Sequence, residues 1–414
     1  MAYRLLLIFF FPIIFIYTVK IAIRYRSLKY FMQRYGFAYP VVGDATIWVH
    51  CASVGEVNTA MPLIKLFLEH NPDQQFVVST ATPTGAKMVV NSKLNNVIHC
   101  YLPVDLYLCV RRFLRKVKPA LAFIMETELW PELYHQCHKL DIPITIINGR
   151  LSRRTLNANN WLKKQYKSAL GRVDHVLARS ETDRQGFLVL GCDAQKIEVL
   201  GNLKFANSAD LNVPDVSDFT RRHYILAAST HDNEEIQLAE LWKDIDVAGR
   251  LLVIVPRHPE RGKKIADELQ ASGLDVVLRS DQQPVTENTQ IYIADTLGEL
   301  TGFMANAEIV FMGGSLVKHG GQNILEPARL SRPIIVGPYF YNFQQEVDQF
   351  LDNQACIQVE DINQLATSIT DLLNNKDLRD TLSSRAAQLM EQQHDIAEQY
   401  RVRILEYYKD YFLS

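Results

Sequence analysis

Acidic side chains that could accept a proton follow several short apolar segments of this chain. Glu56 ends the run Ser-Val-Gly-Glu at 53–56, directly after the apolar residues 47–51. A carboxylate there can act as a general base toward a hydroxyl, and such help is worth about 10²–10⁴ in rate. The same spacing also predicts a capping box, in which Ser53 caps the following helix and Glu56 reaches back. The residues leave both roles open.

Two further carboxylates follow the apolar segment 121–125, in the run Met-Glu-Thr-Glu-Leu-Trp-Pro at 125–131. Buried acids are rare unless they have partners, so we predict a specific partner for Glu126 or Glu128 and favour a functional role. Lys204 follows the last apolar segment of the N-terminal half. A cation at such a position suits an anionic ligand, although surface cations are most often merely solvated.

The C-terminal half carries groups that suit a phosphate or a base. Arg257 and His258 follow an apolar segment and stand between two prolines, which stiffen the backbone that presents them. Residues 295–299 resemble the start of a helix, whose free backbone N–H groups can bind an anion or a pyrimidine.

A glycine-rich turn precedes the run Asn-Ile-Leu-Glu at 323–326. Its glycines let the backbone approach a phosphate closely, and Glu326 can accept hydrogen bonds from a ribose diol. Asn323 and Glu326 also have the spacing of a capping box, and both roles can hold together.

The elements that position these residues follow from the apolar pattern. From residue 45 onward, short apolar segments alternate with amphipathic stretches, as in β-α-β units with parallel sheets. Ligand sites in such sheets lie beyond the carboxyl ends of the strands. An α/β protein with two Rossmann-like domains facing a cleft is the simplest account, and the cleft is the expected site. We predict strands at 47–51, 76–79, 97–102, 121–125, 144–148, 175–178, 197–200, 224–228, 251–255, 276–278, 291–294, 308–312 and 333–336.

The predicted domain boundaries follow changes in composition. Residues 1–30 form a membrane anchor with a basic collar, and residues 31–206 form the first Rossmann-like domain. Residues 207–222 are polar and indicate a linker before the second domain at 223–377. Residues 378–414 contain neither Gly nor Pro, so we expect helices that pack back across the domain junction.

The first segment is apolar enough to enter a membrane. Residues 5–23 carry one charge, Lys20, and a spanning helix needs about 20 apolar residues. Arg24 and Arg26 follow at once, and the positive-inside rule then places the rest of the chain in the cytoplasm. A cleaved signal peptide is the alternative, but these arginines stand where a cleavage site needs small residues. Pro12 leaves open whether the segment spans fully or lies partly in the interface.

The composition of the whole chain disfavours several other classes. With 44 Lys plus Arg against 46 Asp plus Glu, the net charge is −2, which disfavours a nucleic-acid partner. The six cysteines are scattered, so we expect reduced thiols rather than disulfides or a zinc site. Dinucleotide-binding, P-loop and zinc-protease motifs are absent from the sequence, and no cluster of aspartates requires a metal.

Six short runs, in order along nearly the whole chain, share a pattern with one family. They are S-V-G-E at 53–56, T-P-T-G at 82–85, M-E-T-E-L-W-P at 125–131, G-N-L-K-F at 201–205, P-R-H-P-E-R at 256–261, and G-G-S with N-x-L-E within 313–326. In these runs the chain resembles the 3-deoxy-D-manno-octulosonic acid (Kdo) transferases of lipopolysaccharide synthesis. The resemblance implies a GT-B fold and an inverting glycosyltransferase, with CMP-Kdo as donor and the lipid A precursor lipid IVA as acceptor.

The resemblance also implies roles for individual residues. It puts the catalytic base on Glu56 and transition-state stabilisation on Glu126 and Lys204. Its CMP-binding positions fall on Arg257, His258, Leu297, Gly298, Glu299, Asn323, Ile324, Leu325 and Glu326. No metal or other cofactor is implied. The partners implied are CMP-Kdo, lipid IVA and inner-membrane lipid, with the catalytic domains on the cytoplasmic face.

Two positions depart from the family's pattern, and two alternative functions are considered beside Kdo transfer. Gln322 stands where histidine is usual and Gly149 where alanine is common. A GT-B nucleotide-sugar epimerase or another sugar transferase would share the fold but would not need an anchor beside a basic collar. A catalytically silent membrane scaffold is disfavoured because all three catalytic positions are kept. The number of Kdo units transferred and the oligomeric state do not follow from one sequence.

Overall fold

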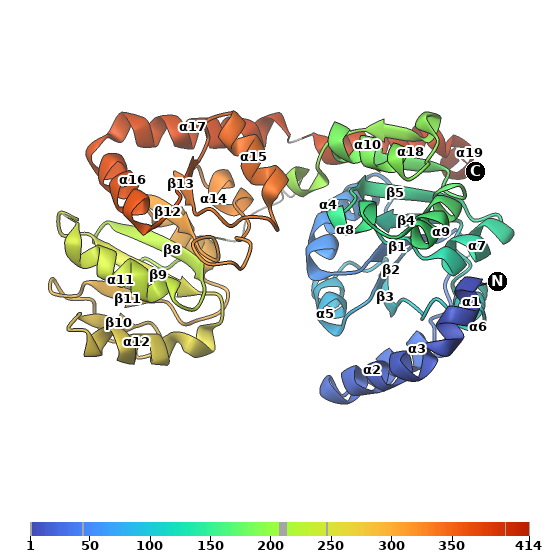
Figure 1. Cartoon of the computed structure of the whole chain (residues 1–414), viewed down its shortest axis with the longest axis horizontal. Coiled ribbons are helices and arrows are strands. Elements are labelled where there is room, and N and C mark those ends of the chain that lie inside the picture. The colour runs from blue at the N-terminus through green and yellow to red at the C-terminus, as the bar shows by residue number, and fades with distance from the viewer. Residues whose placement is uncertain (1, 44, 207–212, 246, 394, 414) are drawn as a thin grey trace. The chain divides into compact units, whose positions relative to one another are not determined.

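The chain forms two compact α/β units. The computed structural model describes residues 2–413, apart from 44, 207–212, 246 and 394. One unit comprises Met1–Asn207 and Asp395–Ser414, and the other Ser208–His394. Each is built on a seven-stranded sheet whose paired strands run parallel (Figure 1). The predicted α/β class and parallel sheets are confirmed.

The first unit has the strand order β3-β2-β1-β4-β5-β6-β7. Its strands are β1 (Ile47–Cys51), β2 (Phe76–Thr80), β3 (Val97–Tyr101), β4 (Leu121–Met125), β5 (Ile144–Gly149), β6 (His175–Ala178) and β7 (Ile197–Val199). Its helices are α1 (Ala2–Phe9), α2 (Phe11–Arg24), α3 (Leu28–Arg34), α4 (Val54–His70), α5 (Pro83–Asn91), α6 (Tyr107–Val117), α7 (Pro131–Lys139), α8 (Arg153–Leu156), α9 (Asn160–Leu170), α10 (Glu181–Val189), η1 (Ala194–Lys196), η2 (Leu203–Ala206), α18 (Ile396–Tyr407) and α19 (Lys409–Leu413).

The second unit has the strand order β10-β11-β9-β8-β12-β13-β14. Its strands are β8 (Tyr224–Thr230), β9 (Leu251–Pro256), β10 (Val276–Leu278), β11 (Ile291–Ile293), β12 (Ile309–Met312), β13 (Ile334–Val336) and β14 (Ile357–Gln358). Its helices are α11 (Glu234–Asp244), η3 (Pro259–Arg261), α12 (Gly262–Ala271), α13 (Leu300–Asn306), α14 (Leu325–Arg329), α15 (Gln344–Asp352), α16 (Ile362–Asn374) and α17 (Lys376–Gln392). The short edge strand β14 was not predicted, because two residues give no periodic signal.

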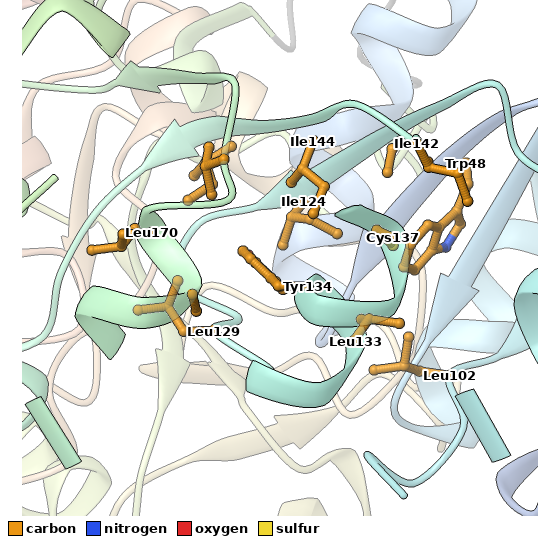
Figure 2. Close-up of a cluster of buried hydrophobic side chains, with 14 of the residues drawn as sticks. Trp48, Leu102, Ile124, Leu129, Leu133, Tyr134, Cys137, Ile142, Ile144 and Leu170 are labelled. Carbon is orange, nitrogen blue, oxygen red and sulfur yellow. The ribbon is translucent and has the colours of Figure 1, made fainter. Parts of the chain in front are cut away.

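The strands are continuous apolar runs because helices cover both faces of each sheet. Every residue of β1 and β4 is buried. Figure 2 shows one face of the first sheet, where Tyr134 and Leu133 of α7 pack beside Ile124 and Ile144. Tyr134 is fully buried, and its hydroxyl donates to the backbone carbonyl of Glu128 at 3.0 Å. The core therefore supports the acidic loop that follows β4.

The N-terminal segment is not the single helix predicted for residues 5–23. α1 ends at Phe9 and α2 begins at Phe11, and the two helices bend by 58° at this break. Pro12 lies in the first turn of α2, where its missing N–H is tolerated, whereas inside one continuous helix it would remove a hydrogen bond and clash. Among the described residues no single helix is long and apolar enough to cross a bilayer, although the bent pair meets both measures together.

The predicted linker is largely part of the second unit. Of residues 207–222, the first six lie outside the described residues. Of the remainder, Val216 is 1% exposed and the Arg222 guanidinium donates to backbone carbonyls of that unit, while residues 213, 215, 217, 218 and 221 are exposed. Val216 and Arg222 therefore attach this stretch to the second unit, whereas its polar composition had predicted a linker.

The C-terminal helices are divided between the two units. α17 ends at Gln392 and belongs to the second unit, while α18 begins at Ile396 and belongs to the first. The region predicted as helical throughout, 378–414, is therefore interrupted. α18 packs on α4 and η2, and its Tyr400 is fully buried there.

Candidate active site

Glu56 lies in the first turn of α4, directly beyond β1, and is 8% exposed. Its Oε2 accepts a hydrogen bond from the backbone N–H of Ala52 at 2.7 Å, and its Oε1 accepts one from the Ser53 hydroxyl at 3.0 Å. Ser53 in turn accepts from the Glu56 N–H as the N-cap of α4. The reciprocal cap predicted from spacing is therefore present, with the N–H of Ala52 in place of that of Ser53. The cap fixes the carboxylate at the end of the strand.

The electrostatics of this site favour the neutral form of Glu56. Burial, and then the negative charges of Glu126 and Glu128, raise the pKa of Glu56 to about 8, although its two hydrogen bonds act in the opposite direction. A carboxyl with a pKa near working pH is suited to general acid–base chemistry.

Glu126 stands directly beyond β4, next to β1 in the sheet. Its backbone has φ +55°, a left-handed conformation that a non-glycine residue adopts at a cost. The carboxylate is nearly buried and pairs with Arg150, whose Nε lies 2.5 Å from Glu126 Oε2. Arg150 follows β5, so two neighbouring strand ends supply the pair. The partner that the sequence required for this acid is thus found.

A buried polar chain lies behind the second carboxylate, Glu128. Its Oε2 accepts from the indole N–H of Trp130 at 2.9 Å and lies 4.0 Å from Nε2 of His50. His50 is fully buried in β1, with Nδ1 2.9 Å from the Ser79 hydroxyl. Burial acts to raise the pKa of Glu128, but His50 and Trp130 outweigh it and lower that pKa. Sequence reasoning missed His50, although a histidine within an otherwise buried apolar strand was a usable signal.

Lys204 is carried by η2, which packs against α4 and α18. The loop is held from two sides. Asn148, at the end of β5, accepts from the Leu203 N–H at 2.9 Å, and the Tyr400 hydroxyl donates to the Gly201 carbonyl at 2.9 Å. The first unit therefore brings Glu56, Glu126 and Lys204 to the carboxyl-end side of its sheet, as the sequence predicted.

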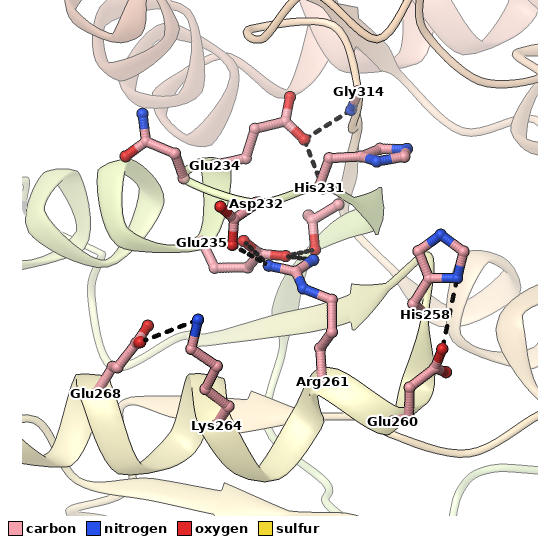
Figure 3. A network of polar contacts seen from close by, with 12 residues as sticks. His231, Asp232, Glu234, Glu235, His258, Glu260, Arg261, Lys264, Glu268 and Gly314 are labelled. Atoms are coloured by element: carbon pink, nitrogen blue, oxygen red, sulfur yellow. Dashed lines mark hydrogen bonds and ion pairs between the residues drawn. The ribbon is translucent and has the colours of Figure 1, made fainter.

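The second unit has its own cluster beyond β8 (Figure 3). Glu234 accepts backbone hydrogen bonds from His231 at 2.9 Å, from Gly314 at 2.6 Å, and from Ser315 and Leu316 at 3.0 Å each. Gly313 is required for this close approach, since a Cβ there would lie 2.6 Å from Thr230 Cα. Three amides of the glycine-rich turn, expected to face a phosphate, are thus bound by a carboxylate of the protein.

Arg257 and His258 lie beyond β9 with exposed side chains. Nearby, the Arg261 guanidinium donates to both carboxylate oxygens of Glu235, at 2.9 and 3.1 Å. The Thr230 hydroxyl also donates to Glu235 at 2.9 Å, and the Thr230 carbonyl accepts the backbone N–H of Arg257 at 2.9 Å. Arg257 and His258 are therefore available to a ligand.

Sequence reasoning identified none of His231, Glu234 and Glu235 in this cluster, and His231 is the one whose ring adjoins the glycine-rich turn. Its ring stacks on that of His319, with centroids 4.2 Å apart, and its Nε2 lies 3.1 Å from Nε2 of Gln322. An amide nitrogen only donates, so Nε2 accepts and Nδ1 carries the proton of the neutral ring. Burial, followed by His319, His258 and the two nearby arginines, lowers the pKa of His231 to about 4. Gln322, which stands where the family usually has histidine, thus fixes the tautomer of the neutral His231 ring.

In the predicted segment 297–299, Leu297 is exposed, whereas the carboxylate of Glu299 is bound within the protein. Leu297 is 85% exposed and Gly298 has φ +91°, but the Glu299 carboxylate is bound by Arg279 at 2.8 Å. This ion pair lowers the pKa of Glu299.

In the run 323–326, Asn323 contacts Glu326 at 3.2 Å, but α14 begins one residue later than the predicted cap requires. The side chains of Ile324 and Leu325 are buried, so these two predicted binding residues have no side chain available to a ligand. No group of three or more His, Cys, Asp or Glu side chains that could hold a metal ion occurs in the described part of the chain.

Comparison with known proteins gives consistent matches. The family described as 3-deoxy-D-manno-octulosonic-acid transferase (kdotransferase) matches residues 29–207. The 3-deoxy-D-manno-octulosonic acid transferase of Haemophilus influenzae is 33% identical over 386 residues, 89% of this chain and 88% of that protein. The transferase of the same name from Rickettsia felis is 34% identical, covering 79% of this chain and 71% of its own length.

Solved structures resemble the fold over most of the chain. The UDP-GlcNAc 2-epimerase of Neisseria meningitidis, bound to UDP-GlcNAc, covers 87% of this chain and all of its own, with a TM-score of 0.60 and 13% identity. At this identity the match shows the fold alone.

Proposed function

The chain belongs to the 3-deoxy-D-manno-octulosonic acid (Kdo) transferase family of glycosyltransferases, and from that premise we propose that it transfers Kdo from CMP-Kdo to lipid IVA with inversion at the anomeric carbon. The observation that carries the mechanism is the environment of Glu56. Its carboxyl is fixed at the end of β1, is nearly buried, and has a pKa raised to about 8 by burial and by acidic neighbours.

In the proposed reaction Glu56 accepts the proton of a primary hydroxyl on the distal glucosamine of the lipid. The oxygen attacks the anomeric carbon of Kdo from the face opposite CMP, so the new bond forms as the bond to the phosphate oxygen breaks. A raised pKa supports this role because a more basic carboxylate accepts a proton more readily. CMP departs with the electron pair of the broken bond.

Charge on the donor needs compensation as CMP leaves. We assign Lys204 and Glu126, with its partner Arg150, to stabilising the transition state in the first unit. We assign CMP binding to Arg257 and His258, to residues 297–299 and to residues 323–326 in the second. The exposed side chains at 257 and 258 support the assignment, since the Arg257 guanidinium and a ring N–H of His258 can donate hydrogen bonds to phosphate oxygens. No metal has a role in this scheme.

The proposed place of the reaction is the cytoplasmic face of the inner membrane. Lipid IVA is an amphiphile that resides in a bilayer, and the exposed apolar side chains of α1 and α2 would bring the enzyme to it. The basic residues that follow α2 are consistent with a cytoplasmic leaflet.

The test is transfer by Glu56→Gln with CMP-Kdo and lipid IVA, followed by mass spectrometry of the lipid. We expect turnover to fall by about 10²–10⁴ while CMP still binds. Glu69→Gln, an exposed acid on the same helix, is the matched control and should keep full turnover. Turnover of Glu56→Gln equal to that of Glu69→Gln would contradict the base assignment. Thermal stabilisation by UDP but not by CMP would instead favour the epimerase alternative.

A further inference from the structure

Both ends of the apolar N-terminal segment are attached to one small part of the first unit. At the start of α1, the Tyr3 hydroxyl donates to Asp105 Oδ2 at 2.7 Å. Arg4 makes a bidentate ion pair with Glu132, at 2.6 and 2.8 Å, and its guanidinium lies 5.0 Å from the ring centre of Tyr107. α1 therefore lies beside α6 and the start of α7 (Figure 1).

The acids that receive α1 are themselves buried. Asp105 is 4% exposed and also accepts the backbone N–H groups of Glu132 and Leu133, which begin α7. Glu132 is 3% exposed and accepts from Gln136 at 2.7 Å. Removing Tyr3 and Arg4 would leave buried carboxylates short of donors, which is strongly unfavourable. The contact is thus a specific attachment.

The far end of the segment binds the neighbouring stretch of chain. Lys29 Nζ donates to the carbonyl of His99 at 3.3 Å, and Arg34 donates to the carbonyl of Leu102 at 2.7 Å. Tyr30 packs edge-on against Tyr101 with ring centres 4.9 Å apart. α3 is therefore held along β3 and the residues just after it.

These attachments are too close together for the segment to cross a bilayer. From His99 to Asp105 the chain makes six steps, which span about 20 Å when fully extended. The hydrocarbon core of a bilayer is about 30 Å thick. A crossing segment would separate its two ends by that thickness, whereas here both ends are bound to residues 99–105 and the adjoining α7.

The surface between the two attachments is apolar and its only charges are positive. Phe9, Ile13, Ile16 and Ile23 are between 63% and 78% exposed. Residues 1–43 contain no acidic side chain, and Arg24, Arg26 and Lys29 are exposed beside the apolar ones. Exposed apolar side chains next to cations fit the surface of an anionic lipid leaflet.

We propose that α1 and α2 lie in one leaflet of the membrane as a bent, in-plane anchor, with the N-terminus on the same side as the catalytic units. This rests on the proposed membrane attachment but not on the sugar chemistry. It replaces the spanning anchor expected from hydropathy.

Cysteine labelling tests which side each end occupies. Ala2→Cys and, as the matched control, Asp281→Cys on the exposed surface of the second unit are placed in the wild-type chain, whose six cysteines are buried. Inverted vesicles and spheroplasts are treated with a membrane-impermeant maleimide, and each rate is divided by the rate in detergent micelles. We expect both positions to react from the same side. Reaction from opposite sides would overturn the proposal.

Flotation with liposomes tests the lipid-binding face. Ile13→Glu/Ile16→Glu is compared with Val90→Glu/Val189→Glu, a control that places the same charges on exposed sites of α5 and α10. We expect the control to float with phosphatidylglycerol vesicles and the α2 variant to lose most of its binding. Equal flotation would overturn the proposal. The proposal would also be overturned if the wild-type protein were a dimer and the α2 variant, but not the control, were a monomer. A second copy of the chain would then cover the apolar face. Kdo transfer enters neither readout.

Discussion

Glu56 and Glu234 occupy corresponding places in the two units, but their carboxylates differ in the number of hydrogen-bond donors and in the charges around them. Each carboxylate lies in the first turn of the helix that follows an interior strand, β1 or β8, and each is nearly or fully buried. Glu234 accepts four backbone N–H groups and links β8 to the turn after β12. Glu56 accepts two hydrogen bonds and has acidic neighbours instead.

The difference teaches how one local motif can serve structure or chemistry. Burial raises the pKa of both acids, but in Glu234 backbone donors oppose it, whereas in Glu56 the neighbouring charges reinforce it. A carboxylate whose lone pairs are bound by amides is a structural bridge. A carboxylate that has few hydrogen-bond donors and lies beside other acids has a raised pKa and can accept a proton.

The largest effect should come from Glu56→Gln. We expect kcat to fall by about 10²–10⁴ with CMP affinity unchanged, since the proton acceptor is lost and the donor site is untouched. Steady-state kinetics and calorimetric CMP titration measure the two quantities. Loss of CMP binding instead would make Glu56 a structural residue like Glu234.

Glu234→Ala should act on stability. It leaves backbone N–H groups of Gly314, Ser315 and Leu316 without their acceptor, and each unsatisfied buried group costs about 1–3 kcal/mol. We expect the free energy of unfolding of the second unit to fall by several kcal/mol, measured in urea. Glu240→Ala, an exposed site on the same helix, should change it little. An unchanged stability would refute the bridging role.

The pH dependence should distinguish the two acids further. Only ionised Glu56 accepts a proton, so its pKa of about 8 predicts that kcat/KM falls roughly tenfold per pH unit below that value. Because this folded-state pKa exceeds the unfolded value of about 4.3, the stability linked to Glu56 is complete below pH 4.3 and is lost as pH rises through about 8. Glu56→Gln should therefore gain stability relative to wild type at pH 9. A kcat/KM that is flat between pH 6 and 8 would contradict the raised pKa.

The smallest effect should follow Gln322→Ala. The change removes one hydrogen bond, worth about 1 kcal/mol, that fixes the tautomer of His231, whose ring centre lies 6.3 Å from that of His258 in the proposed CMP site. We expect CMP to bind a few-fold more weakly, with stability nearly unchanged. Gln354→Ala, at an exposed site of the same unit, serves as the calorimetric control. If the Gln322→Ala and Gln354→Ala variants bound CMP equally well, His231 would have no part in CMP binding.

Most strands could be predicted because the strands of a covered parallel sheet are continuous apolar runs. Glu56 and Glu126 could be predicted because they directly follow such runs. His50 and Asn148 could not be assigned roles, since their partners, Glu128 and Leu203, are 78 and 55 residues away in sequence. The spanning anchor was predicted from hydropathy alone, which carries no information about the acids that bind Tyr3 and Arg4.

The sequence by itself determined the α/β class, the strand positions, the family and the acids at the strand ends, because these depend on local pattern and order. The tertiary structure decided which carboxylate is satisfied by backbone amides, which has a raised pKa, and where the N-terminal helices are attached. Those properties depend on burial and on partners that only folding brings within hydrogen-bond distance.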